Sequence, residues 1–219
     1  VARATTSCPL LERMSPFQMK GLRFILERGG RALLADEMGC GKTLQAISAI
    51  AAYQAWPVLI ICPAALRLHW AQELERWLPE LLLPRDVHVI FESNHMLPND
   101  RDPSKMPKVV VLSFAMARIL VSAGNLDKRA FGLCIVDESH QFRVNFHTCK
   151  PPPETIKTLN LIRDIPRLIL CTGTPCLNNY LDVYCQADLL MPGLFSSFWR
   201  FFINYDIHTL EMSKRQFMM

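Results

Sequence analysis

Short apolar runs alternate with longer amphipathic segments along most of this chain, and this alternation limits the folds that it can adopt. The runs VLIIC, VVVL and LCIV, at residues 58–62, 109–112 and 133–136, contain no charged residue. A strand with one exposed face shows polar residues at every second position, whereas a strand buried on both faces is apolar throughout. The alternation therefore predicts an α/β protein with a mainly parallel sheet and helices on both faces.

The expected strands and helices follow one another in almost regular order. Strands are expected at residues 31–35, 58–62, 87–91, 108–112, 133–137 and 167–171. Helices are expected at residues 16–28, 42–54, 64–78, 114–123, 154–164 and 179–190, with loops at 92–107 and 141–153. The first helix has Ser15 as its N-cap and Pro16 at its first position. The chain then divides into a lead-in (1–14), one domain (15–194) and a C-terminal extension (195–219).

The composition fits one globular domain. A chain of 219 residues that is 50% hydrophobic can bury a sizeable core, and a net charge of +4 permits a nucleic-acid partner without requiring one. The 8 cysteines include no C-x-x-C pair, which argues against a zinc site and for a reducing, intracellular compartment. Cys62, Cys134 and Cys171 lie in or at the ends of apolar runs, where we expect buried thiols.

One uncharged segment, residues 43–66, is long enough to resemble a membrane span. Pro57 and Pro63 interrupt it, so a helix followed by a buried strand explains it better, and we expect no membrane partner. No signal peptide is recognisable. Because the chain starts without Met and stops abruptly at KRQFMM, we expect it to be a piece of a longer protein.

The stretch ADEMGCGKT follows the first expected strand and opens the next helix, as a phosphate-binding loop does. The strict pattern G-x-x-x-x-G-K-[ST] requires glycine at the position of Asp36, but that glycine shapes the turn and binds no phosphate. Gly39 and Gly41 let backbone N–H groups approach an anion. Lys42 can then reach the β- and γ-phosphates, and Thr43 offers a hydroxyl to Mg²⁺. The alternative is a glycine-flanked turn with an accidental Lys-Thr pair.

Two adjacent carboxylates end the strand expected at residues 133–137. Ligands of open parallel sheets gather at the carboxyl edge of the strands, where Asp137 and Glu138 lie. We predict that Asp137 holds hydrated Mg²⁺ and that Glu138 orients or deprotonates the attacking water. A solvated pair of carboxylates is the alternative.

A third motif, TGTP at residues 172–175, ends the last expected strand. Alone it is a turn with hydroxyl groups, but three strand-end motifs in this order rarely arise by chance. With them, and with SPFQMKGLRFIL upstream, nearly the whole chain resembles the Swi/Snf-type helicase-like ATPases of helicase superfamily two. The resemblance implies a RecA-like phosphate-loop lobe, and it explains Asp-Glu-Met before the glycine as the family's habitual form.

The resemblance also implies roles for individual residues. Motif I, with ATP-binding residues, would comprise Asp36, Glu37, Met38, Gly39, Cys40, Gly41, Lys42 and Thr43. Motif II, the DE-x-H box, would comprise Asp137, Glu138, Ser139 and His140, and motif III would include the coupling residues Thr172, Gly173 and Thr174. The catalytic residues would be Lys42, Asp137 and Glu138, with Mg²⁺ on Thr43 and Asp137. Gln18 would recognise adenine.

The segments ICPAALRLHWAQELERW and VVVLSFAMA take the places of motifs Ia and Ib, which line the DNA track in this family. The implied cofactors are ATP and Mg²⁺, and the implied partner is double-stranded or forked DNA. Nucleosomes or replication and repair proteins are further candidate partners, and the nucleus is the implied location. ICPAALRLHW followed by ELERWLP is most similar to the annealing-helicase branch.

The chain departs from the family pattern without losing a ligand. Cys40 replaces the usual Leu, Ser139 replaces Ala or Gly, and CLNNYLDVYCQADLL is an unusual continuation after TGTP. We expect Trp70 and Trp77 to pack in the core rather than stack on bases. Contacts to the DNA phosphate backbone would come from N–H groups of the chain, from hydroxyls such as Ser113 and from scattered Lys and Arg residues. The candidate cations, most of which we expect to be simply solvated, are Lys105, Lys108, Lys128, Arg129, Arg143 and Lys150.

Three functions fit these motifs to different degrees. The favoured one is the ATP-binding lobe of a DNA translocase whose second lobe, with its arginine fingers, is needed for full activity. A non-catalytic DNA-binding or scaffold module that keeps nucleotide as a structural ligand is the alternative. A small-molecule kinase explains the loop but has no use for DE-x-H and TGTP together.

Overall fold

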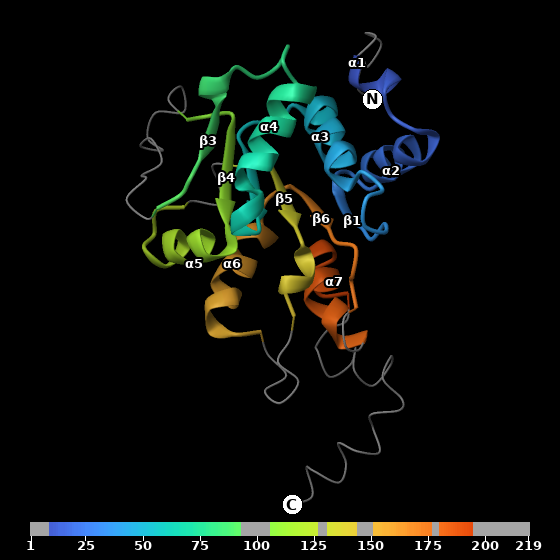
Figure 1. Cartoon of the computed structure of the whole chain (residues 1–219). Helices are drawn as coiled ribbons and strands as arrows, with labels where there is room; N and C mark the ends of the chain where they lie inside the picture. Colours follow the sequence, from blue (N-terminus) through green and yellow to red (C-terminus); the bar gives the residue numbers. More distant parts are fainter. Residues whose placement is uncertain (1–8, 93–105, 127–130, 144–150, 177–179, 195–219) are drawn as a thin grey trace, which may run out of the picture.

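The computed structural model describes residues 9–92, 106–126, 131–143, 151–176 and 180–194. Within them, six strands form one parallel sheet (Figure 1) in the order β1-β6-β5-β2-β4-β3. The strands are β1 (Arg31–Leu34), β2 (Val58–Cys62), β3 (Val87–Val89), β4 (Val109–Ser113), β5 (Leu133–Asp137) and β6 (Arg167–Cys171). Every residue of β2 and β4 is buried, as the apolar runs at residues 58–62 and 109–112 predict. The predicted parallel sheet is therefore confirmed.

Seven α-helices are described around the sheet. They are α1 (Pro9–Glu12), α2 (Pro16–Glu27), α3 (Lys42–Tyr53), α4 (Arg67–Trp77), α5 (Phe114–Ser122), α6 (Pro153–Arg163) and α7 (Tyr184–Leu190). Short 3-10 turns include η1 (Ala64–Leu66), η2 (Pro84–Asp86), η5 (Ser139–Gln141) and η6 (Tyr180–Val183). None of the helices in the described part of the chain is long and apolar enough to cross a membrane.

The two faces of the sheet carry separate apolar cores. On one face, α1 to α4 pack through residues such as Ile25, Ile47 and Trp70 against every second residue of the strands. On the other face, α5, α6 and α7 pack against the remaining strand residues through side chains such as Leu120 and Ile162. The strands thus alternate their side chains between two apolar layers, which confirms helices on both faces.

The first long helix begins as predicted. The hydroxyl of Ser15 accepts a hydrogen bond from the backbone N–H of Gln18, and the Gln18 side chain accepts one from the backbone N–H of Ser15. This reciprocal pair is a capping box. Leu10 and Met14 are buried in the same core, so residues 9–14 of the expected lead-in pack against the sheet domain.

Two predicted helices differ at their starts. The helix expected from residue 64 opens with the 3-10 turn η1, closed by a hydrogen bond from Leu66 N to Pro63 O, and becomes α-helical at Arg67. Short 3-10 turns are common at helix ends. The helix expected at residues 179–190 is the 3-10 turn η6 followed by α7, and residue 179 lies outside the described residues. The C-terminal extension, 195–219, also lies outside them.

Three of the cysteines are packing residues, as predicted. Cys62, Cys134 and Cys171 are fully buried. Burial raises the pKa of the Cys62 thiol to about 12 and the pKa of Cys134 above its ordinary range. Because the thiolate is the reactive form, these side chains behave as small apolar groups.

Candidate active site

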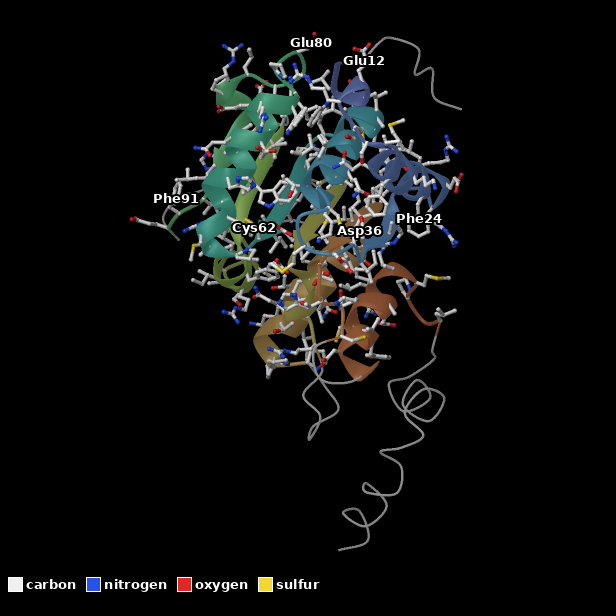
Figure 2. The ribbon with its side chains drawn as sticks, turned by 45° about the vertical axis from the view of Figure 1, so that its right-hand side comes forward. Glu12, Phe24, Asp36, Cys62, Glu80 and Phe91 are labelled. Atoms are coloured by element: carbon white, nitrogen blue, oxygen red, sulfur yellow. The ribbon has the colours of Figure 1, made fainter. Side chains whose placement is uncertain are left out.

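Three neighbouring strands bring the three sequence motifs to one edge of the sheet. Cys171 at the end of β6 pairs with Leu34 of β1 on one side and with Asp137 of β5 on the other. The backbone N–H of Thr172 also donates to Leu34 O. Figure 2 shows Asp36, just past β1, at the same level as Cys62, the last residue of β2. The glycine loop, the DE-x-H box and the TGTP turn therefore all start from this carboxyl edge.

The glycine loop has the backbone that its sequence predicts. Gly39 and Gly41 have φ angles of 82° and 80°, which side-chain-bearing residues rarely adopt. A Cβ at Gly41 would also lie 2.3 Å from Gln18 Nε2. That same nitrogen donates to Cys40 O at 3.3 Å, so α2 supports the loop from the side.

The Gln18 amide has bonding capacity beyond these structural contacts. Its oxygen accepts from Ser15 N and its nitrogen donates to Cys40 O. A side-chain amide has two donor hydrogens and two acceptor lone pairs, so among the described residues one of each is left for a ligand. Adenine presents an adjacent donor and acceptor, and Gln18 can match them without leaving the capping box.

Lys42, the first residue of α3, is held by the loop itself. Its ammonium group donates to Asp36 O at 2.7 Å and to Glu37 O at 2.9 Å. Among the described residues these are its two acceptors, and an ammonium has three donors. The cation therefore lies inside the loop and keeps a donor for an anion.

Asp36, which stands where the strict loop pattern has glycine, makes a structural contact. Its carboxylate accepts a hydrogen bond of 2.9 Å from the side-chain amide of Gln45. Gln45 of α3 is completely buried. Its amide oxygen packs so closely against Gly21 of α2 that a Cβ at Gly21 would lie 1.7 Å from it. Asp36 thus pairs a buried donor that a glycine would leave unsatisfied.

The first carboxylate of the box is fixed by two donors. Trp70 Nε1 of α4 donates to Asp137 Oδ2 at 2.9 Å, and the backbone N–H of Glu138 donates to Asp137 Oδ1 at 3.0 Å. Trp70 itself is completely buried, so the prediction that it packs rather than stacks on bases is confirmed. Its indole N–H adds a second task, which is to orient the carboxylate.

The second carboxylate lies on a strained backbone. Glu138 has a φ angle of 53°, which is uncommon for a residue with a side chain and often marks a functional position. Its Oε2 atom lies 3.1 Å from His140 Nδ1. The contact is an ion pair only when the imidazole ring is protonated.

His140 connects the box to the TGTP turn. Its Nδ1 atom lies 2.9 Å from Thr172 Oγ1 and 3.4 Å from Thr174 Oγ1. Thr172 Oγ1 also accepts from the backbone N–H of Thr174, at 3.1 Å. Glu138 and the turn therefore contact the same histidine nitrogen.

The TGTP turn also touches the glycine loop. A Cβ at Gly173 would lie 2.8 Å from Met38 Cγ, 3.4 Å from Met38 N and 3.6 Å from Lys42 Nζ, so the turn lies directly against the glycine loop. Burial and then the charge of Asp137 raise the pKa of Cys171 well above its ordinary value, with smaller effects from the charges of Lys42, Asp36 and Glu138. The four charged side chains thus surround the end of β6.

This donor set fits a magnesium nucleotide. The loop presents glycines with left-handed backbones and an ammonium with a donor to spare. Asp137 keeps lone pairs beyond the two donors that orient it, and carboxylates and hydroxyls such as that of Thr43 are the oxygen ligands that Mg²⁺ prefers. The residues could therefore hold both groups.

The residues that were expected to contact DNA do not all lie near this site. Ser113 is 5% exposed and its hydroxyl caps α5 by accepting from Met116 N, so its expected contact with DNA stays a prediction. Lys108 lies at the opposite edge of the sheet, 3.1 Å from Asp86 Oδ2. Arg143, beyond the box, is exposed. The other cations, Lys105, Lys128, Arg129 and Lys150, lie outside the described residues.

Sequence reasoning missed three polar side chains of this region. They are Gln45, Trp70 in its donor role, and Gln186 of α7, which accepts a hydrogen bond from Ser139. The available signal was a polar group on the apolar face of a helix, since such groups require partners when buried. Such a polar group indicates that a hydrogen-bond partner is needed, but the sequence does not identify that partner.

The parallel sheet and the three strand-end motifs define an α/β phosphate-loop lobe. The same fold occurs in the Sulfolobus solfataricus SWI2/SNF2 ATPase core, solved in complex with dsDNA, with a TM-score of 0.63 and 24% sequence identity over 85% of this chain and 37% of that chain. The expected RecA-like lobe is thereby confirmed.

Sequence comparisons give the family. The family model described as SNF2-related domain matches residues 17–217 of this chain. The human "DNA annealing helicase and endonuclease ZRANB3" is 35% identical over 94% of this chain and 18% of its own length. The Xenopus laevis "SWI/SNF-related matrix-associated actin-dependent regulator of chromatin subfamily A-like protein 1" is 35% identical over 90% of this chain and 19% of its own length.

The chain belongs to the SNF2-related family of helicase-like proteins. The resemblance to the annealing-helicase branch fits these relatives. The chain spans about a fifth of the length of the curated relatives that it matches.

The pairing of Asp36 with Gln45 leads to a prediction about stability. Asp36→Gly would restore the strict loop pattern, yet it leaves the buried Gln45 amide without its acceptor. We expect the free energy of unfolding to fall by about 1–3 kcal/mol, measured by urea denaturation. Glu37→Ala is the control because Glu37 is exposed and contributes only its backbone carbonyl, so its effect should stay within about 0.5 kcal/mol. An Asp36→Gly variant as stable as the wild type would contradict this role.

Proposed function

We propose that this chain is the ATP-binding lobe of a DNA-dependent motor that hydrolyses ATP to move along double-stranded DNA, remodelling nucleoprotein or re-annealing strands. The observation that carries the proposal is the meeting of three motifs at one sheet edge. His140 joins the box to the TGTP turn, and Gly173 places that turn against Met38 and Lys42. A structural turn or a solvated carboxylate pair would not require these contacts.

Magnesium ATP, when bound, supplies the phosphoanhydride bond whose cleavage drives the motor. Lys42 and the N–H groups of the glycine loop would bind the phosphates, and Thr43 and Asp137 would hold the metal. Trp70 keeps the Asp137 carboxylate in one orientation. Glu138 would orient the attacking water and accept its proton, and His140, which contacts both Glu138 and Thr172, would link Glu138 to the TGTP turn.

The DNA partner is proposed from the family and its relatives. Their names refer to DNA annealing and to chromatin, and we extend a DNA substrate and a nuclear location to this chain. The overall test is the ATPase rate of the intact protein without DNA and with double-stranded, forked or single-stranded DNA. DNA should stimulate turnover, and duplex or forked DNA should do so most. An intact protein that binds nucleotide but never hydrolyses it would favour a non-catalytic module.

The first kinetic prediction concerns Lys42. Lys42→Ala removes the cation that neutralises the phosphate oxygens, so ATP turnover by the intact protein should fall at least about 100-fold. DNA binding without nucleotide should survive. Lys20→Ala, an exposed lysine on α2, is the matched control and should hydrolyse ATP at the wild-type rate. Normal turnover in Lys42→Ala would refute the assignment of the loop.

The second kinetic prediction separates the two carboxylates of the box. Glu138→Gln preserves side-chain shape at the same φ angle of 53°, so ATP affinity should be retained while turnover falls about 100-fold or more. Asp137→Asn should instead weaken Mg²⁺ binding, so that half-maximal turnover requires a higher Mg²⁺ concentration. Steady-state kinetics with a magnesium titration distinguish the two, and Glu75→Gln, exposed on α4, serves as the control. If both box variants hydrolyse ATP normally, the carboxylates are structural.

A third prediction concerns the DNA contact. Binding through the phosphate backbone should be nearly independent of base sequence and should weaken with salt, with a log-log slope of about −0.9 per phosphate neutralised. Arg143→Ala should make the slope shallower by about 1. Lys108→Ala should not, because Asp86 already pairs with Lys108 at the far edge of the sheet. Titration of two unrelated duplexes at several salt concentrations measures this, and strong sequence preference would refute a motor that tracks the backbone.

A further inference from the structure

A buried hydrogen-bond network joins the box to helix α7. Ser139 and Gln186 have no exposed surface, and the Ser139 hydroxyl donates to Gln186 Oε1 at 2.7 Å. Gln186 Nε2 donates to Pro175 O at 3.2 Å and to Asp182 O at 3.4 Å. One side chain therefore contacts the box, the last residue of the TGTP turn and the 3-10 turn η6.

The chemistry of these partners fixes the orientation of the amide. Backbone carbonyls only accept, so the nitrogen of Gln186 must face Pro175 and Asp182, and its oxygen must face the Ser139 hydroxyl. An apolar side chain at position 186 would leave a buried hydroxyl and two carbonyls without this partner. Buried polar networks of this kind specify one arrangement because every alternative leaves groups unpaired.

The network lies next to the strained residue of the site. Ser139 directly follows Glu138, whose φ angle is 53°. The turn η5 is closed by hydrogen bonds from Gln141 N to Glu138 O, at 3.1 Å, and from Phe142 N to Ser139 O, at 2.9 Å. A left-handed glutamate needs support from its surroundings. The buried hydroxyl of Ser139 is the attachment that fixes the backbone carrying the Glu138 carboxylate.

Helix α7 is also fastened at its other end. The guanidinium of Arg31, the first residue of β1, donates to Leu190 O at 3.1 Å and to Leu189 O. It also donates to Ile165 O, just after α6, at 2.7 Å. The helix is thus attached to the start of β1 by Arg31 and to the box by Gln186.

We infer that Gln186 is a positioning residue that holds the box in place through Ser139, so that helix α7 sets the position of Glu138 for hydrolysis. This inference rests on the function proposed above. Gln186 acts through Ser139 and does so from the buried side of the box. The contact of His140 with Thr172 and Thr174 is a separate connection between the box and TGTP.

The test uses Gln186→Met, Ser139→Ala and the double variant in the intact protein. Each single variant should lower kcat for DNA-stimulated ATP hydrolysis about 10- to 100-fold, because displacement of a catalytic group is costly, while KM for ATP stays within about twofold. The double variant should lose no more than the worse single variant, since both remove one network. Ser48→Ala is the control: Ser48 is a buried serine on α3 that donates to Leu44 O, and its loss should leave kcat unchanged.

A second measurement is independent of ATP turnover. Hydrogen exchange of the backbone amides of Gln141 and Phe142, without nucleotide, should become faster in Gln186→Met and in Ser139→Ala but not in Ser48→Ala. Unchanged exchange at these amides would overturn the inference, as would faster exchange with kcat within twofold of the wild type. If the wild-type protein proves unable to hydrolyse ATP, the proposed function fails, and the exchange data alone decide whether Gln186 positions the box. Should Gln186→Met not fold, Ser139→Ala, the smaller change, provides both measurements.

Discussion

The pairing of β1, β6 and β5 is the constraint on which the site depends. Neighbouring parallel strands lie about 4.8 Å apart, and their register places Leu34, Cys171 and Asp137 in one row. The loops that follow these residues therefore leave the sheet side by side, at its carboxyl edge. Residues separated by more than a hundred positions in the chain therefore share one site because of backbone hydrogen bonds, before any side chain makes a contact.

Side chains of four different helices then hold the glycine loop and the DE-x-H box in place through hydrogen bonds. Gln18 of α2 bonds the glycine loop at Cys40, and Gln45 of α3 bonds it at Asp36. Trp70 of α4 bonds Asp137, and Gln186 of α7 bonds Ser139. Each contact satisfies a buried or half-buried polar group, so the helices that bury the apolar faces of the sheet also orient its polar edge. A change in how these helices pack on the sheet would consequently also change the geometry of the site.

Much of this could be predicted from the sequence because local patterns carry it. The alternation of apolar runs predicts the parallel sheet, and capping residues predict where helices such as α2 begin. Strand-end motifs predict the site because parallel strands share a carboxyl edge. The order of the strands in the sheet, and the side chains that hydrogen-bond to the loops, could not be predicted from the sequence. Trp70 and Asp137 are 67 positions apart, and only three-dimensional packing decides that they meet. The helix-capping role of Ser113 was likewise not predicted from the sequence.

The two attachments of α7 have a consequence for how this region can change. The helix has seven residues, Tyr184–Leu190, with the Gln186 amide near its start and the carbonyls bound by Arg31 at its end. One inserted residue would rotate everything after it by about 100° and advance it by about 1.5 Å. Either the amide or the terminal carbonyls would then miss their partners. The length of this helix is thus set by the distance between two fixed points, and related chains that keep both contacts must keep the same residue count between them.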